Sequence, residues 1–485
     1  MQRLSRRRFL EQSMLATAAA VTAATPGSTP AQERTTTSPN ERLSVAVLGV
    51  RGRGQGHADA FAAREDCAVT YVCDADRKVG EAYAEKFAAK YDSKPVFVDD
   101  MRRIFDDPSV DVVSIATPNH WHSLAAIWAM QAGKDVYVEK PVSHNVSEGR
   151  RMVQTMQKHG RICQGGTQYR SGGSNRAAAE AIKQGKLGRI KLAQCFTYRL
   201  RTPIGPPGEY PVPESVDYNL WAGPAPMQIP LRRRNFHYDW HWIWDYGNGE
   251  LGNNSVHAVD TMRLLLDLNG LGRGVMSYGG RQFDDAGETP NTQITVHDFG
   301  EVTVVQEVRN LKTDRPPRGA TILVEGTEGF LVGTLGGNTI FDLDGNLVEK
   351  VEGPGDNHFG NFFKAVYSRK VEDLNAPIVE GHLSTALVHV GNVSHVLGRK
   401  AAPADIAAQL EAHQGNYEAL EAFERIRSHL AEHKVDIASP DQQLELGPWL
   451  AIDSDSETFG DNAEANALLT REYRKPFVVP TADEV

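Results

Sequence analysis

Residues 43–56 read LSVAVLGVRGRGQG, and this stretch decides how the first part of the chain folds. Its first half is an apolar run of the kind that a buried parallel strand requires. Its second half is rich in glycine and leads into an Ala-rich helical segment at 57–64. Glycines at such a turn let the backbone approach a pyrophosphate, whose charge is met by the helix N-terminal amides. The stretch therefore predicts a strand–turn–helix unit that binds a dinucleotide.

The candidate cofactor ligands of this turn are Gly49, Arg51, Gly52, Arg53 and Gly54. The strict GxGxxG pattern is not met, because Arg51 stands at the middle glycine position. Arg51 and Arg53 are therefore candidates for direct phosphate contact. A glycine-rich turn alone also fits an ordinary tight turn, so its context has to decide between the two interpretations.

Asp74 supplies that context. It ends the next apolar run, AVTYVC at 68–73, and follows Gly54 by 20 residues. An acid in this position accepts hydrogen bonds from a ribose diol and repels a 2′-phosphate. We therefore expect NAD(H), with NADP(H) as the alternative because Arg77 lies nearby.

The pattern of strands and helices divides the chain into domains. Strands and helices alternate over residues 42–165, which predicts a Rossmann NAD(P)-binding domain with a doubly wound parallel sheet. Longer β-type runs follow, and they predict a substrate and oligomerisation α/β domain at 166–400 with an open, largely antiparallel sheet. The composition then turns helical, so residues 401–485 are predicted to be a helical C-terminal extension.

The N-terminus carries a targeting pattern. Residues 5–10 read SRRRFL, and a weakly apolar stretch follows at 14–24. A twin arginine before such a stretch is the bacterial address for export of folded proteins. We predict an export signal at 1–31, a polar linker at 32–41, and a periplasmic or extracytoplasmic location. A basic tail with chance arginines is the alternative.

Composition excludes several classes of protein. The net charge is −10, which argues against binding to a nucleic-acid backbone. No apolar run after residue 31 is long enough to span a bilayer. No metal site is predicted, because the four cysteines form no CxxC pair. They are Cys67, Cys73, Cys163 and Cys195.

Two further segments follow predicted strands of the same sheet, TPNHWH at 117–122 and EKP at 139–141. Ligands of open α/β sheets bind at the carboxyl ends of the strands, so both segments are expected at one crevice. Lys140 can hydrogen-bond a substrate hydroxyl there and tune its proton loss, although an ion pair with Glu139 is the alternative. The further cofactor candidates are Thr117, Pro118, Asn119, His122, Glu139 and Lys140.

The glycine-rich turn, the TPNH segment and above all EKP resemble the Gfo/Idh/MocA oxidoreductases, the family of glucose–fructose oxidoreductase and inositol dehydrogenase. The stretches at 216–226 and 249–260 add to the resemblance, which covers residues 43–400. It implies a Rossmann domain, a C-terminal α/β domain with an open sheet, and a homodimer or homotetramer. It also implies that Lys140 lies at the nicotinamide and the substrate, and that the Lys140–Pro141 bond is cis.

The family's substrate-domain motif presents an Asp and, four residues later, a His. Here His257 is present, but Asn253 stands at the Asp position. Asn cannot act as a general acid or base, although it can orient a hydroxyl. We therefore expect His257 to transfer the proton, with Lys140 assisting and Asp260 orienting the imidazole or stabilising the fold. A buried structural histidine is the alternative for His257.

Further substrate contacts are expected from two places. The aromatic stretch FHYDWHWIWDY at 236–246 contains His237 and Trp240, and aromatic faces stack on the apolar faces of sugars. A core or an oligomer interface is an equally physical interpretation of this stretch. The residues that follow the last Rossmann strand, where the family lines its substrate pocket, are Gln168, Tyr169 and Arg170.

Together these features predict hydride transfer between a sugar or polyol carbinol and a nicotinamide cofactor. Free NAD(H) is scarce outside the cytoplasm, so the cofactor would be loaded before export, held tightly and recycled internally. A glycosidase that uses NAD for oxidation, elimination and reduction is the first alternative. A non-catalytic sugar-binding protein on the same fold is the second.

Overall fold

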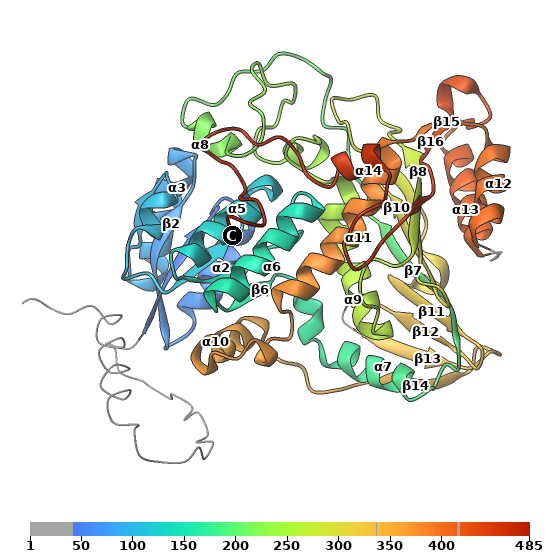
Figure 1. Cartoon of the computed structure of the whole chain (residues 1–485), viewed down its shortest axis with the longest axis horizontal. Helices are drawn as coiled ribbons and strands as arrows, with labels where there is room; N and C mark the ends of the chain where they lie inside the picture. Colours follow the sequence, from blue (N-terminus) through green and yellow to red (C-terminus); the bar gives the residue numbers. More distant parts are fainter. Residues whose placement is uncertain (1–41, 336, 415–417) are drawn as a thin grey trace, which may run out of the picture.

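The computed structural model describes residues 42–335, 337–414 and 418–485. Two α/β parts lie side by side in it, and helix α11 (Ile378–Val396) runs between them (Figure 1). This helix contacts α6 and β6 of the first part and α9 and β8 of the second. The predicted export signal at 1–31 and the linker at 32–41 lie outside the described residues.

The first part holds a six-stranded parallel sheet in the order β3-β2-β1-β4-β5-β6, which confirms the predicted Rossmann sheet. Along β1, Val45 and Val47 pack with α2 and α3, whereas Ala46 and Leu48 pack with α5 and α6. This burial on both faces explains the continuous apolar run. The strands are β1 (Leu43–Leu48), β2 (Cys67–Cys73), β3 (Val96–Val98), β4 (Val112–Ile115), β5 (Asp135–Val138) and β6 (Cys163–Gly165).

Helices cover both faces of this sheet. One of them, α10, comes from the second half of the chain and adds Phe362 and Phe363 to the core beneath α2 and α3. Three helices begin with side-chain caps: Asp76 accepts from the amides of Lys78 and Val79, Asn145 from that of Glu148, and Asn357 from that of Gly360. The helices are α2 (Arg53–Ala62), α3 (Arg77–Tyr91), α4 (Arg102–Phe105), α5 (Asn119–Gln131), α6 (Val146–His159) and α10 (His358–Ser368).

The second part is built on an 11-stranded mixed sheet. Its pairings are antiparallel except for β7 with β10, which confirms the predicted open, largely antiparallel sheet. Its larger core lies against α7 (Gly173–Lys183), α9 (Val256–Leu266) and α11. The first eight strands are β7 (Ile190–Tyr198), β8 (Gly274–Gly280), β9 (Thr292–Asp298), β10 (Thr303–Arg309), β11 (Ile322–Gly326), β12 (Phe330–Gly333), β13 (Asn338–Phe341) and β14 (Leu347–Val351).

The C-terminal extension is only partly helical, so the expectation of a helical 401–485 needs correction. Helices α12 (Pro403–Gln414) and α13 (Glu418–Glu432) cover the opposite face of the sheet. Beyond them, β16 (Leu444–Leu446) and β17 (Leu450–Ala451) pair with β8, and β15 (Arg399–Ala401) pairs with β16. Strands β16 and β17 thus cover one edge of β8, whose backbone groups would otherwise be unpaired. After α14 (Ala463–Ala467), the chain returns to the first part (Figure 1).

The segment 199–250 connects β7 to residues 251–255, which precede α9, and it passes over the first sheet (Figure 1). It carries α8 (Tyr218–Ala222) and the short helix η2 (Asp239–Trp242). The backbone of Val216 forms a bridge with Asp76, and Nε2 of His237 lies 2.9 Å from the Asp76 carboxylate. The segment thereby closes over the carboxyl ends of the parallel strands.

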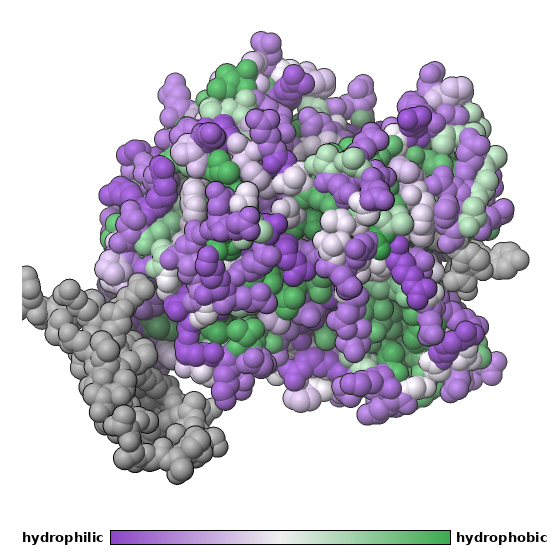
Figure 2. Space-filling model, in the orientation of Figure 1, coloured by the Kyte–Doolittle hydropathy of each residue, from purple (hydrophilic) through white to green (hydrophobic). Residues whose placement is uncertain are grey.

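The face of the molecule in Figure 2 is largely hydrophilic, with hydrophobic residues in smaller areas between. Within the described residues, no helix is both long enough and apolar enough to cross a membrane. The same residues contain no group of three or more His, Cys, Asp or Glu side chains placed to hold a metal ion. All four cysteines are buried and free.

Candidate active site

A cavity of about 740 Å³ lies at the carboxyl ends of the parallel strands and is lined by both parts of the chain. This is the edge where open α/β sheets bind ligands, and the volume suits a small molecule or cofactor. Most of the predicted site residues line it. They are Gly49, Arg51, Gly52, Arg53, Asp74, Thr117, Pro118, Asn119, His122, Glu139, Lys140, Gln168, His237, Trp240, Asn253 and His257.

The glycine-rich turn is shaped by close packing on one side and open space on the other. Gly49 has φ +80°, and a Cβ there would lie 2.5 Å from the carbonyl oxygen of Ala116. A Cβ on Gly54 would lie 2.0 Å from the Gly49 carbonyl oxygen, so Gly54 serves helix packing and does not line the cavity. Gly52 meets nothing within 4 Å and begins α2 without a side-chain cap. The first amides of α2 are thus available to an anion.

Asp74 lies at the end of β2 beside this turn. Its carboxylate accepts hydrogen bonds from the amides of Val50 and Asp76, each at 3.0 Å. Burial raises the pKa of Asp74 to about 6, although the two amides oppose the shift. The carboxylate therefore both braces the turn and lines the cavity.

Glu139 is fixed by side chains other than Lys140. Its Oε1 accepts from Nε of Arg53 at 2.7 Å and lies 3.0 Å from Nε2 of His57. Nδ1 of His57 is in turn 2.9 Å from Oγ of Ser114. Burial alone would raise the pKa of Glu139, but His57 and Arg53 hold it well below its usual range. An ionised carboxylate is therefore part of the cavity lining.

Lys140 reaches across to the second part of the chain. Its Nζ donates to the backbone carbonyl oxygen of Asn253 at 2.6 Å. The alternative in which Lys140 forms a surface ion pair with Glu139 is therefore wrong, because Arg53 and His57 already hold that carboxylate. Burial lowers the pKa of Lys140 from its ordinary value. The Lys140–Pro141 bond is cis, in agreement with the resemblance.

A histidine joins the two strand-end segments. Nδ1 of His122 lies 2.6 Å from the carbonyl oxygen of Pro141, and Nε2 lies 2.7 Å from the carbonyl oxygen of Thr117. The hydroxyl of Thr117 is buried and has no hydrogen-bond partner among the described residues. His122 therefore holds the loops in place, while Thr117 leaves a polar atom for a ligand.

The motif before α9 forms a π-helical turn, η3 (Leu251–Ser255), which the sequence did not predict. Such turns free backbone groups and often occur at functional sites. Here the carbonyl of Asn253 receives the Lys140 ammonium. The side-chain nitrogen Nδ2 of Asn253 and Nδ1 of His257 are buried, with no hydrogen-bond partner within the described part of the chain. Both side chains line the cavity, so they offer polar atoms to a ligand.

The environment of His257 determines its charge. Burial and the neighbouring Lys140 lower the pKa of His257 to about 3, so the imidazole is neutral near pH 7. The ring of Tyr169 meets it edge to face at 5.2 Å. Tyr169 itself does not line the cavity and acts as a support for the imidazole.

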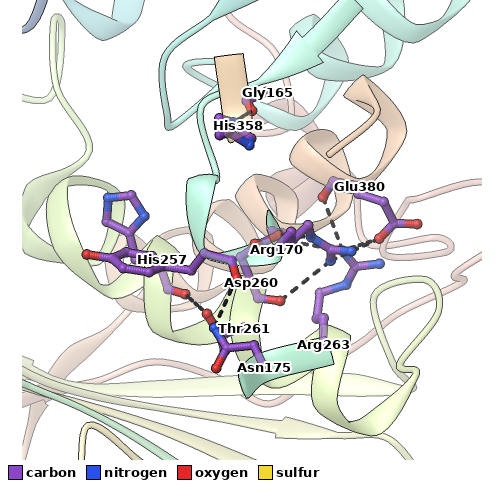
Figure 3. Close-up of polar contacts among 11 residues, drawn as sticks. Gly165, Arg170, Asn175, His257, Asp260, Thr261, Arg263, His358 and Glu380 are labelled. Atoms are coloured by element: carbon purple, nitrogen blue, oxygen red, sulfur yellow. Dashed lines mark hydrogen bonds and ion pairs between the residues drawn. The ribbon is translucent and has the colours of Figure 1, made fainter. Parts of the chain in front are cut away.

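Arg170 was predicted to bind substrate, but the structure places it in a buried ion-pair network instead (Figure 3). Its Nε donates to Oδ1 of Asp260 at 2.7 Å, and its Nη2 lies 3.1 Å from Glu380, which also pairs with Arg263. Asp260 is therefore engaged by Arg170 and does not orient the imidazole of His257. The carboxylates that offset the desolvation of this guanidinium come from α9 and α11.

The aromatic stretch divides between the cavity lining and a core. His237 and Trp240 line the cavity, together with Tyr238 and His241. Phe236 and Tyr246 instead join a separate core with Trp221. The fully buried guanidinium of Arg233 lies against this core, 4.9 Å from the Tyr246 ring and 5.0 Å from that of Trp221.

Several lining residues were not predicted. The residues after β3 could have been found, because they also follow a parallel strand. Arg199 and Phe477 are far in sequence from every recognised motif and carry no local signal. The lining residues that the sequence analysis missed are Cys73, Ala75, Asp99, Asp100, Met101, Arg102, Ala116, Trp121, Trp128, Arg199, Leu220, Trp221, Tyr238, His241 and Phe477.

Two family models match the chain. Residues 43–167 match one described as an oxidoreductase family with an NAD-binding Rossmann fold. Residues 206–420 match one described as the C-terminal alpha/beta domain of the same GFO_IDH_MocA family. The two matches cover both halves of the cavity, since Lys140 lies in the first and His257 in the second.

Curated relatives match over part of their length. The chain is 31% identical over 167 residues to levoglucosan dehydrogenase from Pseudarthrobacter phenanthrenivorans, covering 34% of this chain and 36% of that protein. It is 31% identical over 169 residues to a glycosyl hydrolase family 109 protein from Solibacter usitatus, covering 34% and 39%. The chain therefore matches less than two fifths of either relative.

A solved structure of levoglucosan dehydrogenase, in complex with NADH and levoglucosan, resembles the fold with a TM-score of 0.53. The sequences are 20% identical, and the alignment covers 72% of this chain and 95% of that one. This likeness supports the two-part architecture.

The ion pairs of Arg170 predict a structural role for this residue. Arg170→Met leaves the Asp260 carboxylate, which is 1% exposed, without its guanidinium. We expect the free energy of unfolding to fall by about 3–5 kcal/mol in urea titrations. The exposed Arg51→Met is the matched control and should change it by less than about 0.5 kcal/mol. Unchanged stability of Arg170→Met would contradict this assignment.

Proposed function

This chain belongs to the Gfo/Idh/MocA family of oxidoreductases, and we propose that it transfers hydride between a nicotinamide cofactor and a carbinol carbon of a sugar or polyol. The observation that carries the proposal is the meeting of Lys140 with Asn253 and His257 in one cavity. These residues come from different parts of the chain, yet their polar groups face the same space. The levoglucosan dehydrogenase relative supports a sugar as the substrate class.

The residues of the cavity fit a dinucleotide. The open space at Gly52 and the uncapped amides of α2 suit a pyrophosphate, and Asp74 suits a ribose diol. Lys140 and the unpaired hydroxyl of Thr117 lie at the ends of β5 and β4, where a nicotinamide would be held. When bound, the nicotinamide accepts or supplies the hydride.

Lys140 is placed to stabilise negative charge on the substrate oxygen. Its ammonium has three N–H donors, and the carbonyl of Asn253 uses one of them. The others can bind a hydroxyl that is losing its proton. Burial lowers the pKa of Lys140, which weakens its hold on its own proton. The ionised Glu139 behind it favours the charged form.

His257 is placed to take the hydroxyl proton. Its imidazole is neutral, because burial and Lys140 lower its pKa to about 3. A neutral ring can accept a proton at Nδ1 or Nε2, and Nδ1 has no hydrogen-bond partner among the described residues. Asn253 cannot take up the proton, but its free amide nitrogen can orient the substrate hydroxyl.

The test is turnover with a panel of sugars and polyols, followed by the absorbance of reduced nicotinamide. We expect Lys140→Met to lower kcat by roughly 10²–10³-fold with little change in the Kd of the dinucleotide, because the turn and Asp74 would hold the cofactor. The exposed Lys183→Met is the control and should retain full activity. Equal turnover by Lys140→Met and the unmodified protein would refute the proposed role.

A second candidate is a glycosidase that oxidises a sugar carbon, eliminates the aglycone and then reduces the product. The glycosyl hydrolase family 109 relative favours this alternative. Release of the aglycone from an aryl glycoside, without net change in the cofactor, would identify it. Sugar binding without either reaction would instead indicate a non-catalytic binding protein.

We also propose NAD(H) as the preferred cofactor. Asp74 lines the cavity, and Arg77, which could have favoured a 2′-phosphate, pairs with Asp99 at 3.2 Å. The carboxylates of Asp74 and Asp99 thus lie where the 2′-phosphate of NADP(H) would bind.

The raised pKa of Asp74 predicts how NAD⁺ binding depends on pH. Asp74 has a pKa of about 6 in the free protein, so its carboxylate is lost as the pH falls through this value. We expect the Kd of NAD⁺ to rise about tenfold from about pH 7.5 to about pH 5, because a protonated carboxyl accepts hydrogen bonds poorly. Calorimetric titration measures this change. Asp74→Asn should bind weakly at every pH, and a persistent pH dependence in that variant would count against Asp74.

Export through the twin-arginine route is likewise proposed from residues 1–31 alone. A cofactor loaded before export and recycled internally follows from this location. Replacing Arg6 and Arg7 together by Lys should leave the protein in the cytoplasm, whereas Arg3→Lys should not. Cell fractionation measures the outcome, and normal export of the double variant would overturn the proposal.

A further inference from the structure

The C-terminal tail, residues 468–485, runs from α14 back to the first part of the chain and passes α8 and α5 (Figure 1). Hydrogen bonds from Arg474 hold the tail against α8. Its Nε donates to the carbonyl oxygen of Gly223 at 3.0 Å, and its Nη1 and Nη2 donate to the side-chain and carbonyl oxygens of Asn219, each at 2.6 Å. The tail is therefore a fixed part of the structure.

Phe477 is the anchor of this tail. Its side chain is 1% exposed and belongs to the core of the Rossmann domain. The ring meets Trp121 edge to face at 5.5 Å and lies 6.4 Å from the ring of Trp128. The guanidinium of Arg102 lies over the ring, 5.6 Å from its centroid. Phe477 thus packs near two side chains, Trp128 and Arg102, and lines the cavity with them.

The strand order locates this end of the cavity. In the order β3-β2-β1-β4-β5-β6, the strand before Arg102 and the strand before Lys140 lie on opposite sides of β1. A dinucleotide with its pyrophosphate at the turn after β1 and its nicotinamide at Lys140 therefore has its adenine toward β3. Arg102 follows β3 on that side, and the ring of Phe477 lies near both Arg102 and Trp128, so all three lining residues belong to one end of the cavity.

We propose that the C-terminal tail completes the adenine subsite, with Trp128 and Arg102 facing the base and Phe477 as the positioning residue beside them. The proposal rests on the proposed function, because it requires an adenine dinucleotide. The chemistry suits an uncharged planar base, since aromatic and guanidinium groups stack on such a ring. Nε of Arg102 donates to both Asp100 carboxylate oxygens at 3.0 Å and Nη2 donates to one of them at 2.6 Å, so its charge is already balanced.

The assignment explains why the tail returns to this place. Trp128 is half-buried, and the rings of Trp121 and Phe477 lie 6.0 and 6.4 Å from its own. With the Phe477 ring in place, Trp128 keeps one orientation. The adenine half of the cofactor would then bind well only when the tail is packed in this place.

The experiment compares three probes on the full-length protein: NADH, ADP-ribose and reduced nicotinamide mononucleotide. ADP-ribose has the adenine without the nicotinamide, and the mononucleotide has the nicotinamide without the adenine. We expect Phe477→Ala to raise the Kd of NADH and ADP-ribose about tenfold and to leave that of the mononucleotide unchanged. Val478→Ala, at the exposed neighbouring position, is the control and should change none of them.

Trp128→Ala keeps the tail anchor and should show the same selectivity, so it decides the matter if Phe477→Ala does not fold. Equal weakening of all three probes, or no weakening in either variant, would overturn the adenine subsite. An unmodified protein that binds none of the probes would refute the proposed function itself, together with this inference. A protein that binds the mononucleotide and NADH equally well refutes the inference alone.

Discussion

The hydrogen bond from Lys140 to the backbone carbonyl of Asn253 is the contact on which the site depends. It joins the end of a parallel strand to the π-helical turn before α9, and so brings the two parts of the chain to one cavity. An ammonium and a peptide carbonyl form a strong, charge-assisted bond when water is excluded. Because the acceptor is a backbone atom, the side chains of Asn253 and His257 remain free for a ligand.

This bond depends on a second arrangement of charge. Glu139 adjoins Lys140 in the sequence and would attract its ammonium, but Arg53 and His57 already hold the carboxylate. Lys140 is therefore directed away from the strand and into the cavity. In the cavity, the Lys140 ammonium lies near the imidazole of His257. This imidazole is neutral, because burial and Lys140 both lower the pKa of His257. A cationic ammonium and a neutral imidazole at one place provide a donor and an acceptor for acid–base chemistry on a hydroxyl.

The chain beyond residue 400 serves both parts of the molecule. Helices α12 and α13 cover a sheet face, and β16 and β17 pair with β8, so this extension is integral to the second part. The tail then contributes Phe477 to the core of the first. Contacts between residues so far apart in sequence form late, because closing the long loop costs conformational entropy. The cavity is therefore complete only when the whole chain has folded.

The sequence by itself determined the parallel sheet and the glycine-rich turn, because hydrophobic period and strand-end position are local properties. It also predicted four of the residues that line the cavity: Asp74, Lys140, Asn253 and His257. The tertiary structure alone decided which partner each buried charge takes. Arg170 follows a Rossmann strand as expected, yet α9 and α11 supply the carboxylates that hold it away from the cavity. The π-helical turn and the return of Phe477 have no local signal either. Desolvation makes a buried charge costly unless a partner lies beside it, and that partner can come from any distance along the chain.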